Sequence, residues 1–314
     1  MNKVTIIGAG NVGATIAYTM TYAGIASDIL LIDVNHKKAE GEALDIRQGT
    51  PYCPPCNIYA GDYCDAVDSD IVVVTSGLAR KPGQTRLELT QANVDIIRDV
   101  APKITEFAPN AIYVIVSNPV DILTYAFCKF TNIPENHIIG SGTILDTSRL
   151  RANLAEYYQI SKKNVHAFVL GEHGDSSIVP WSICNFSNIP VLNYTNAIRH
   201  GNKTYPKLNT EEVEQFVRSS GTRIIEMKGA TYYAVSICVC QICRCILTGV
   251  DTALTVSTML HGEYGIEDVA LSILCNIGKN GIHSKLILPI TADETIGLQR
   301  SAKALKDVID ITKF

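Results

Sequence analysis

The stretch Gly8-Ala9-Gly10-Asn11-Val12-Gly13 decides how the chain begins to fold. It follows a short apolar run at residues 4–7 and opens a helical stretch expected at residues 10–23. In a GxGxxG turn of this kind, the glycines allow a tight turn, a close approach of backbone to pyrophosphate and close packing of helix on strand. The unpaired N–H groups at the start of the helix favour a phosphate. The stretch therefore predicts a dinucleotide-binding βαβ unit.

The acidic residue that such a unit needs is present downstream. Asp33 lies 20 residues after Gly13, at the end of a second apolar run at residues 29–32. A carboxylate in this place accepts the ribose hydroxyls of NAD and repels the extra phosphate of NADP. We therefore expect NAD as the cofactor. The expected binding residues are Gly8, Gly10, Asn11, Val12, Gly13 and Asp33; the alternative is a glycine turn in a Rossmann fold that binds no nucleotide.

Further apolar runs alternate with helical segments, which is typical of a parallel sheet covered on both faces. The runs lie at residues 71–74 and 112–116, and the helical segments at 37–47 and 87–107. After about residue 142, helices interrupted by loops and short strands are expected at residues 146–158, 211–226, 229–247 and 293–309. We predict an α/β protein with two domains. The domains are an N-terminal Rossmann NAD-binding domain at residues 1–142 and an α+β substrate-binding and catalytic domain at residues 143–314.

The bulk composition fits this division and excludes some partners. The chain has 314 residues, of which 46% are hydrophobic and 18% charged, so two domains with large cores are expected. Its net charge is −4 without a long block of either sign, which argues against binding nucleic acid or a membrane surface. The first expected strand begins at Lys3, and no apolar run is as long as a membrane span. We therefore expect a cytoplasmic enzyme.

The ten cysteines suggest an alternative kind of site. Cys53-Pro54-Pro55-Cys56 has the spacing of a metal knuckle or a redox pair. No second CxxC or paired histidine stands at zinc-finger distance, so we expect reduced thiols and no metal. The cysteines between residues 238 and 245 lie in an apolar helical segment and are expected to be buried. A non-catalytic NAD-binding scaffold or a thiol redox sensor remains the alternative class of function.

Two stretches carry the side chains needed to move a proton and to bind a carboxylate. They are Asp146-Thr147-Ser148-Arg149 and Gly171-Glu172-His173-Gly174-Asp175. An imidazole, with an ordinary pKa of about 6.5, can give and take a proton at neutral pH, and a guanidinium binds a carboxylate through two parallel hydrogen bonds. Downstream of a nucleotide loop, these groups predict hydride transfer on a small 2-hydroxy or 2-keto acid. A buried structural histidine and a helix-capping aspartate are the alternatives.

Seven motifs run from the first strand to the C-terminal helix. They are GAGNVG at 8–13, RKPGQTR at 80–86, SNPVDILTY at 117–125, GSGTILDTSRLR at 140–151, LGEHGDSS at 170–177, KGATYYA at 228–234 and LTVSTMLHGEYGIEDV at 254–269. In this combination the chain resembles the L-lactate/malate dehydrogenase superfamily, and its bacterial L-lactate dehydrogenases most closely. The combination is far more specific than any one motif.

The resemblance implies a role for each matching residue. His173 corresponds to the general acid–base, and Asp146 to the carboxylate that orients the imidazole. Arg149 corresponds to the residue that holds the substrate carboxylate, and Arg86 to the one that polarises the carbonyl from a closing loop. A solvated surface arginine is the alternative for Arg86. Asn118 matches the residue that supports cofactor and substrate oxygen, and Thr231 matches one that lines the substrate pocket.

One position departs from the lactate pattern. Arg80 stands where lactate dehydrogenases usually have a glutamine and malate dehydrogenases an arginine. A buried guanidinium facing the methyl group of pyruvate would lack a partner, so Arg80 argues for oxaloacetate. The GEHGD turn, Trp181 and the GATYY run are lactate-like. The resemblance therefore implies reversible reduction of pyruvate to L-lactate, with malate dehydrogenase as the alternative, and we expect Arg80 to swing outward with its loop.

A second pair of residues suggests regulation. Arg151 and His166 match the pair that binds fructose 1,6-bisphosphate between subunits in many bacterial lactate dehydrogenases. The resemblance thus implies an allosteric effector, a homotetramer and a place in fermentation after glycolysis. Ordinary interface residues are the alternative for this pair.

Overall fold

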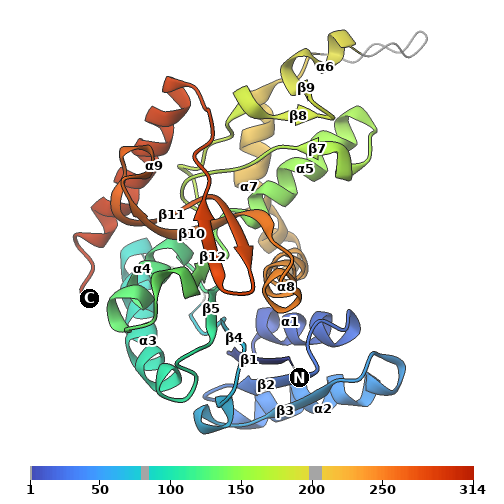
Figure 1. The fold of residues 1–314 in the computed structure, drawn as a ribbon, viewed down its shortest axis with the longest axis vertical. Coiled ribbons are helices and arrows are strands. Elements are labelled where there is room, and N and C mark those ends of the chain that lie inside the picture. Colours follow the sequence, from blue (N-terminus) through green and yellow to red (C-terminus); the bar gives the residue numbers. More distant parts are fainter. Residues whose placement is uncertain (1, 79–84, 198–206) are drawn as a thin grey trace.

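The computed structural model describes residues 2–78, 85–197 and 207–314. They form a large sheet flanked by helices, and a smaller lobe beyond it (Figure 1). In the first half of the chain the elements are β1 (Lys3–Ile7), α1 (Asn11–Tyr22), β2 (Asp28–Ile32), α2 (His36–Gly49), β3 (Asn57–Ala60), β4 (Ile71–Val74), α3 (Arg86–Phe107), β5 (Ile112–Ile115), α4 (Val120–Phe130) and β6 (Ile138–Gly140). In the second half they are α5 (Ile144–Tyr158), β7 (Val165–His166), β8 (Asn185–Phe186), β9 (Ile189–Pro190), α6 (Val191–Ala197), α7 (Thr210–Lys228), α8 (Tyr233–Thr248), β10 (Thr252–His261), β11 (Glu267–Gly278), β12 (Gly281–Lys285) and α9 (Ala292–Ile309).

The large sheet has the strand order β12-β11-β10-β6-β5-β4-β1-β2-β3. The six strands β3, β2, β1, β4, β5 and β6 are parallel and follow the order 3-2-1-4-5-6 of dinucleotide-binding folds. Ile7 pairs with Val74, Val74 with Ile115, and Ile115 with Gly140, so the carboxyl ends of four strands form one row. In such open sheets ligands bind at this edge, where the strand order reverses, here between β1 and β4.

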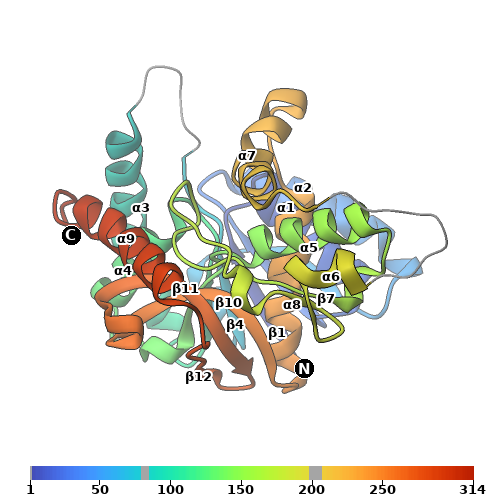
Figure 2. The ribbon, with the colours of Figure 1, turned by 90° about the horizontal axis from the view of Figure 1, so that it is seen from above.

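The parallel strands form because their side chains are apolar on both faces. Val4, Ile6 and the whole of β4 are completely buried. Helices α1 and α8 pack together on one side of the sheet, and α3 and α4 on the other (Figure 2). Side chains fix where two of the helices begin: Asn35 caps α2, and Thr85 forms a capping box with Glu88 at the start of α3. The expected strands and helices of this half are confirmed.

The second half departs from the sequence expectation in two places. Strands β10 and β11 have 10 and 12 residues, so the expectation of only short strands was wrong. They pair antiparallel over most of their length, and β10 joins β6 through the pair Ser257 and Gly140. The helix expected at 229–247 begins only at Tyr233, because Gly229 has φ +84° and ends α7 in the left-handed conformation. Thr231 lies in the break between the two helices.

The smaller lobe supports helix α5, which carries three of the candidate site residues. It contains the sheet β7-β8-β9 and α6, and it lies at the end of the molecule opposite β1–β3 (Figure 1). Its separate core includes Leu150, Leu154 and Tyr158 of α5, packed with Phe186 and Val217. The apolar face of α5 is thereby held in place. No helix within the described ranges is both long enough and apolar enough to cross a membrane.

Candidate active site

The nucleotide loop leaves no room for side chains at its tightest point. A Cβ atom added at Gly13 would lie 1.9 Å from the carbonyl oxygen of Gly8, whereas one at Gly10 would meet nothing within 4 Å. Helix α1 begins directly after Gly10, with no side-chain cap and no acidic residue in its first turn. The first N–H groups of α1 are therefore available for an anion, and the open space at Gly10 lets a phosphate approach the backbone.

Asp33 holds this loop against the end of β2. One carboxylate oxygen accepts the N–H of Ala9 at 2.7 Å, and the other accepts the N–H of Asn35 at 2.8 Å. A carboxylate has acceptor capacity beyond two bonds, so Asp33 can still receive ribose hydroxyls. A cavity of about 680 Å³ adjoins Gly8, Gly10, Asp33 and Thr75 at the carboxyl ends of β1, β2 and β4. The loop, the helix start, the acid and the cavity fit an NAD molecule.

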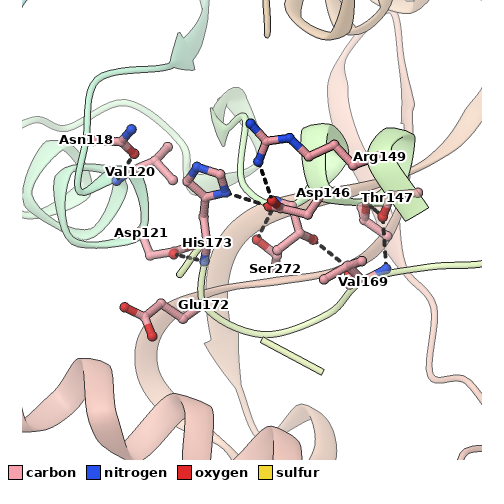
Figure 3. Close-up of polar contacts among 12 residues, drawn as sticks. Asn118, Val120, Asp121, Asp146, Thr147, Arg149, Val169, Glu172, His173 and Ser272 are labelled. Atoms are coloured by element: carbon pink, nitrogen blue, oxygen red, sulfur yellow. Dashed lines mark hydrogen bonds and ion pairs between the residues drawn. The ribbon is translucent and has the colours of Figure 1, made fainter. Parts of the chain in front are cut away.

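The acid–base cluster lies where α5 approaches the turn that contains His173 (Figure 3). His173 Nδ1 lies 2.6 Å from Asp146 Oδ2, and Arg149 Nη1 donates to Asp146 Oδ1 at 3.0 Å. The side chain of Asp146 is 9% exposed, that of Arg149 13% and that of His173 22%. One buried carboxylate therefore binds both an imidazole and a guanidinium, each of which reaches the solvent only partly.

The charges in this cluster stabilise one another. Burial disfavours an ionised Asp146, but His173 and Arg149 outweigh burial and keep the pKa of Asp146 below its ordinary value. Asp146 in turn raises the pKa of His173 above its ordinary value, against the opposing effect of burial. The arrangement favours a protonated imidazole whose Nδ1 is held by Asp146 and whose Nε2 is turned away from it.

A cavity of about 290 Å³ connects this cluster with the other candidate residues. Asn118, Asp146, Arg149, His173 and Thr231 all line it, as does Val12 of the nucleotide loop. The structure thus brings together residues from five separated segments. Asn118 is positioned by bonds to its own neighbourhood: its side-chain oxygen accepts the N–H of Val120 at 3.3 Å, and its backbone oxygen accepts from Asn93 at 2.8 Å.

Sequence reasoning missed part of this cavity. One face of α7 lines it with residues spaced at i, i+3, i+4 and i+7: Arg218, Gly221, Thr222 and Ile225. Arg218 is fixed there by bonds to the carbonyl of Ser177 at 2.8 Å and to Glu214 at 2.7 Å. The spacing of these four residues marks one helical face, with the small residues Gly221 and Thr222 at its middle, and this signal is present in the sequence. A fifth residue, Asp121, also escaped notice, and it accepts the backbone N–H of His173 at 2.8 Å.

Two of the expected arginines cannot be placed. Arg80 lies outside the described residues. Arg86 is the first residue of α3, directly after the capping residue Thr85, and its side chain also lies outside the described part. Their expected roles at the substrate therefore stay predictions.

The two expected effector residues lie close together in the smaller lobe. Arg151 Nε donates to the carbonyl of Ala167 at 2.9 Å, and its guanidinium lies 5.2 Å from the ring centre of Phe168. His166 immediately precedes Ala167 on β7 and is exposed. The guanidinium is half-buried, and the imidazole belongs to the residue before its backbone partner; both groups can bind an anion.

The cysteines are all free thiols. Cys238, Cys240, Cys243 and Cys245 are buried in α8, as expected. Cys53 and Cys56 are partly buried beside the end of α2, and burial raises the pKa of Cys56. In the part of the chain that the structure describes, no group of three or more His, Cys, Asp or Glu side chains is arranged to hold a metal ion.

The fold and the site together define an NAD-dependent oxidoreductase with a separate pocket for a small anionic substrate. Residues 2–140 match the family of the lactate/malate dehydrogenase NAD-binding domain, and residues 143–313 match the lactate/malate dehydrogenase alpha/beta C-terminal domain. The chain belongs to the lactate/malate dehydrogenase family, and its cofactor is NAD.

Several similar proteins are L-lactate dehydrogenases by name. An L-lactate dehydrogenase of Thermoanaerobacter pseudethanolicus is 46% identical over 98% of both chains, and one of Acetivibrio thermocellus is 40% identical over 98% of this chain and 96% of the relative. Among solved structures, a minor L-lactate dehydrogenase from Enterococcus mundtii has a TM-score of 0.94 at 35% identity, covering 100% of this chain and 99% of its own. A lactate dehydrogenase from a Medee basin deep-sea metagenome has a TM-score of 0.93 at 35% identity, with 98% of both chains covered.

Proposed function

We propose that this chain catalyses the reversible, NADH-dependent reduction of pyruvate to L-lactate. The observation that carries the proposal is the position of Asp146 between His173 and Arg149, at 2.6 and 3.0 Å, beside the nucleotide loop. The pair supplies a proton donor and a carboxylate-binding cation on one wall of a small cavity. The names of the relatives at 40–46% identity favour lactate over malate.

Proton transfer is the task of His173. Asp146 accepts a hydrogen bond from the N–H at Nδ1 of His173, so Nε2 carries the proton that is donated to the keto oxygen of the substrate. Bound NADH supplies the hydride, and NAD⁺ accepts it in the reverse direction. Because Asp146 stays ionised, it stabilises the imidazolium of His173 before the proton leaves. When lactate is oxidised, His173 takes the proton back at Nε2 and Asp146 again stabilises the charged ring.

Substrate orientation is the task of the cationic and polar groups around the same cavity. Arg149 has five N–H donors and uses one on Asp146, so it can hold the substrate carboxylate with the others. Asn118 supports the substrate oxygen and the cofactor, and Thr231 lines the pocket from the break between α7 and α8. Arg86 polarises the carbonyl. In this division of work, residues 1–142 bind NAD and contribute Asn118 and Arg86 to the substrate, and residues 143–314 supply the acid–base group and the remaining substrate-binding residues.

The choice of substrate is tested at Arg80. We expect the wild-type enzyme to prefer pyruvate to oxaloacetate in kcat/KM and to keep some oxaloacetate activity. An Arg80→Gln variant should lose oxaloacetate turnover and keep or gain pyruvate turnover, because the partner for a second carboxylate is removed. A hundredfold preference of the wild type for oxaloacetate would make the protein a malate dehydrogenase. An unchanged ratio in the variant would mean that Arg80 does not contact the substrate.

We also propose that the enzyme is a cytoplasmic homotetramer that reduces pyruvate in fermentation and responds to fructose 1,6-bisphosphate at Arg151 and His166. The proximity of the two residues and the anion-binding character of the pair support an effector site. Pyruvate reduction should be measured with and without the bisphosphate, in the wild type and in Arg151→Gln, and the molecular mass by light scattering. Activation that the variant abolishes is the expected result. An identical response of both enzymes would reject the site.

A further inference from the structure

A buried carboxylate that the proposed mechanism does not use lies next to the backbone of His173 (Figure 3). Asp121 stands in the first turn of α4 and is 2% exposed. Its Oδ2 accepts the N–H of His173 at 2.8 Å, from a residue 52 positions further along the chain. This bond joins the acid–base turn to the helix that starts two residues after Asn118. The position of His173 relative to Asn118 therefore depends on Asp121.

The second oxygen of Asp121 has no such bond. Asp121 Oδ1 is buried, and the polar group near it is the hydroxyl of Ser257, which is also buried and has no other partner among the described residues. A half-satisfied buried carboxylate is costly as an anion. Burial accordingly raises the pKa of Asp121 to about 6, against the lowering effects of the nearby Ser257 hydroxyl and of His173. At neutral and alkaline pH the group is still ionised, and it then places a second negative charge near the imidazole.

Several neighbouring charges affect the pKa of His173. Asp146 makes the largest contribution to raising the pKa of His173, burial opposes it, Asp121 adds a further rise and Arg149 a small decrease. Arg218 lines the same cavity from α7. The imidazole therefore stands between two carboxylates: one on α5 binds its ring, and one on α4 binds its backbone.

We propose that Asp121 is a second positioning residue for the acid–base group, which fixes the backbone of His173 and, as an anion, favours the protonated imidazole. The inference rests on the proposed role of His173. It extends that role, because the position and the protonation of the imidazole then depend on Asp121 of α4 as well as on Asp146 of α5.

Two variants separate the backbone bond from the charge. Asp121→Asn keeps an oxygen that can accept the N–H of His173 but has no charge. The alkaline limb of kcat/KM for pyruvate reduction, which falls as His173 loses its proton, should then move to lower pH by roughly half a unit to one unit. Below the limb, activity should stay within about threefold of the wild type. Asp121→Ala also removes the acceptor and should lower kcat about tenfold at every pH, so that asparagine acts as the partial rescue.

A neighbouring carboxylate provides the matched control. Glu172 precedes His173, but its side chain bonds to Ser176 and is turned away from the imidazole (Figure 3). Glu172→Gln removes the same charge and should move the limb less than half as far as Asp121→Asn. The inference would be overturned if the alkaline limb of kcat/KM moved equally far in both variants, or if it did not move in Asp121→Asn.

A measurement on the wild type covers the case in which the variants do not fold. In protein labelled with ¹³C and ¹⁵N at histidine, the resonance of His173 should show a second ionisation step near pH 6, from Asp121. A single step over the whole pH range would contradict the inference. Failure of the proposed function looks different: the wild type itself would not reduce pyruvate, or a His173 variant would remain active.

Discussion

The nucleotide loop and the acid–base cluster are built in different ways. The loop, between Gly8 and Asp33, offers backbone groups from one continuous βαβ unit. The cluster offers side chains from α5 and from the turn at His173, which lies 27 residues after Asp146. The loop needs the absence of side chains, because the space at Gly13 is already filled by the carbonyl of Gly8. The cluster needs charges held close together under partial burial. The cofactor site therefore depends mainly on local chain geometry, and the proton-transfer site on tertiary packing.

The largest expected effect comes from removing the proton carrier. His173→Asn should lower kcat for pyruvate reduction roughly a thousandfold, because general acid–base groups contribute factors of this order. Binding of NADH, followed by fluorescence, should stay within about twofold of the wild type, since the loop at residues 8–13 makes no use of the imidazole. A variant that retained a tenth of the activity would remove His173 from the mechanism.

Neutralising the partner of His173 should have the next largest effect. Asp146→Asn keeps the size of the side chain but loses the charge that holds the pKa of His173 up. We expect kcat to fall roughly a hundredfold and the alkaline limb of the pH profile to move to lower pH, further than in Asp121→Asn. The exposed residue Asp175, two positions after His173, serves as the control, and its asparagine variant should shift the limb little. A larger shift in the control would contradict the assignment.

A methyl group added to a glycine of the nucleotide loop should have different effects on stability at Gly13 and at Gly10. Gly13→Ala places a Cβ 1.9 Å from the Gly8 carbonyl, so the loop must move, and both the melting temperature and NADH affinity should fall. Overpacking of this kind costs about 1–3 kcal/mol. Gly10→Ala meets nothing within 4 Å and should keep the melting temperature while it weakens NADH binding about tenfold, because the pyrophosphate approaches the backbone there. Equal melting temperatures for both variants would refute this difference.

The smallest expected effect is on stability. The folded-state pKa of His173 lies above the ordinary value of 6.5, so its contribution is fully present below that pH and is lost as pH rises through the raised value. Chemical unfolding of the free enzyme should therefore show a lower free energy of unfolding above pH 6.5, by about 1.4 kcal/mol for each unit of pKa shift. His173→Asn should flatten this decline. Asp121 also contributes to the free energy of unfolding, because its pKa is raised from 3.8 to about 6. This contribution is lost over a lower range, as the pH rises from 3.8 to about 6.

Local signals in the sequence predicted the parts of the molecule that depend on local geometry. The GxGxxG turn, Asp33 and the fully apolar strands could be located because each is defined by neighbours within one βαβ unit. The helix break at Gly229 was missed because a left-handed glycine and a helical one have the same letter. Asp121 could be interpreted as an acid that stabilises the start of a helix, since its bond to His173 depends on a contact 52 residues away.

The pairing of β10 with β6 could not be predicted from local sequence patterns either. It requires one bridge between residues more than a hundred positions apart, and no periodic pattern in the sequence reports it. The role of the arginines at residues 80 and 86 depends on side chains outside the described residues. The family resemblance supplied the roles of the cluster residues, and the geometry supplied their distances.

That bridge makes Gly140 an unusual point of vulnerability. A side chain there would lie 2.3 Å from Thr124 Oγ1 and 2.7 Å from Ser257 Cβ, in the seam where the parallel and antiparallel strands meet. A methyl group there would push β6 away from β10, directly before Ser141 and Gly142, which line the pocket. A saturation-mutagenesis screen for activity should thus register residue 140 as intolerant, although it touches neither ligand. Packing at the junction of the parallel and antiparallel strands thus constrains this residue as strictly as chemistry constrains the catalytic groups.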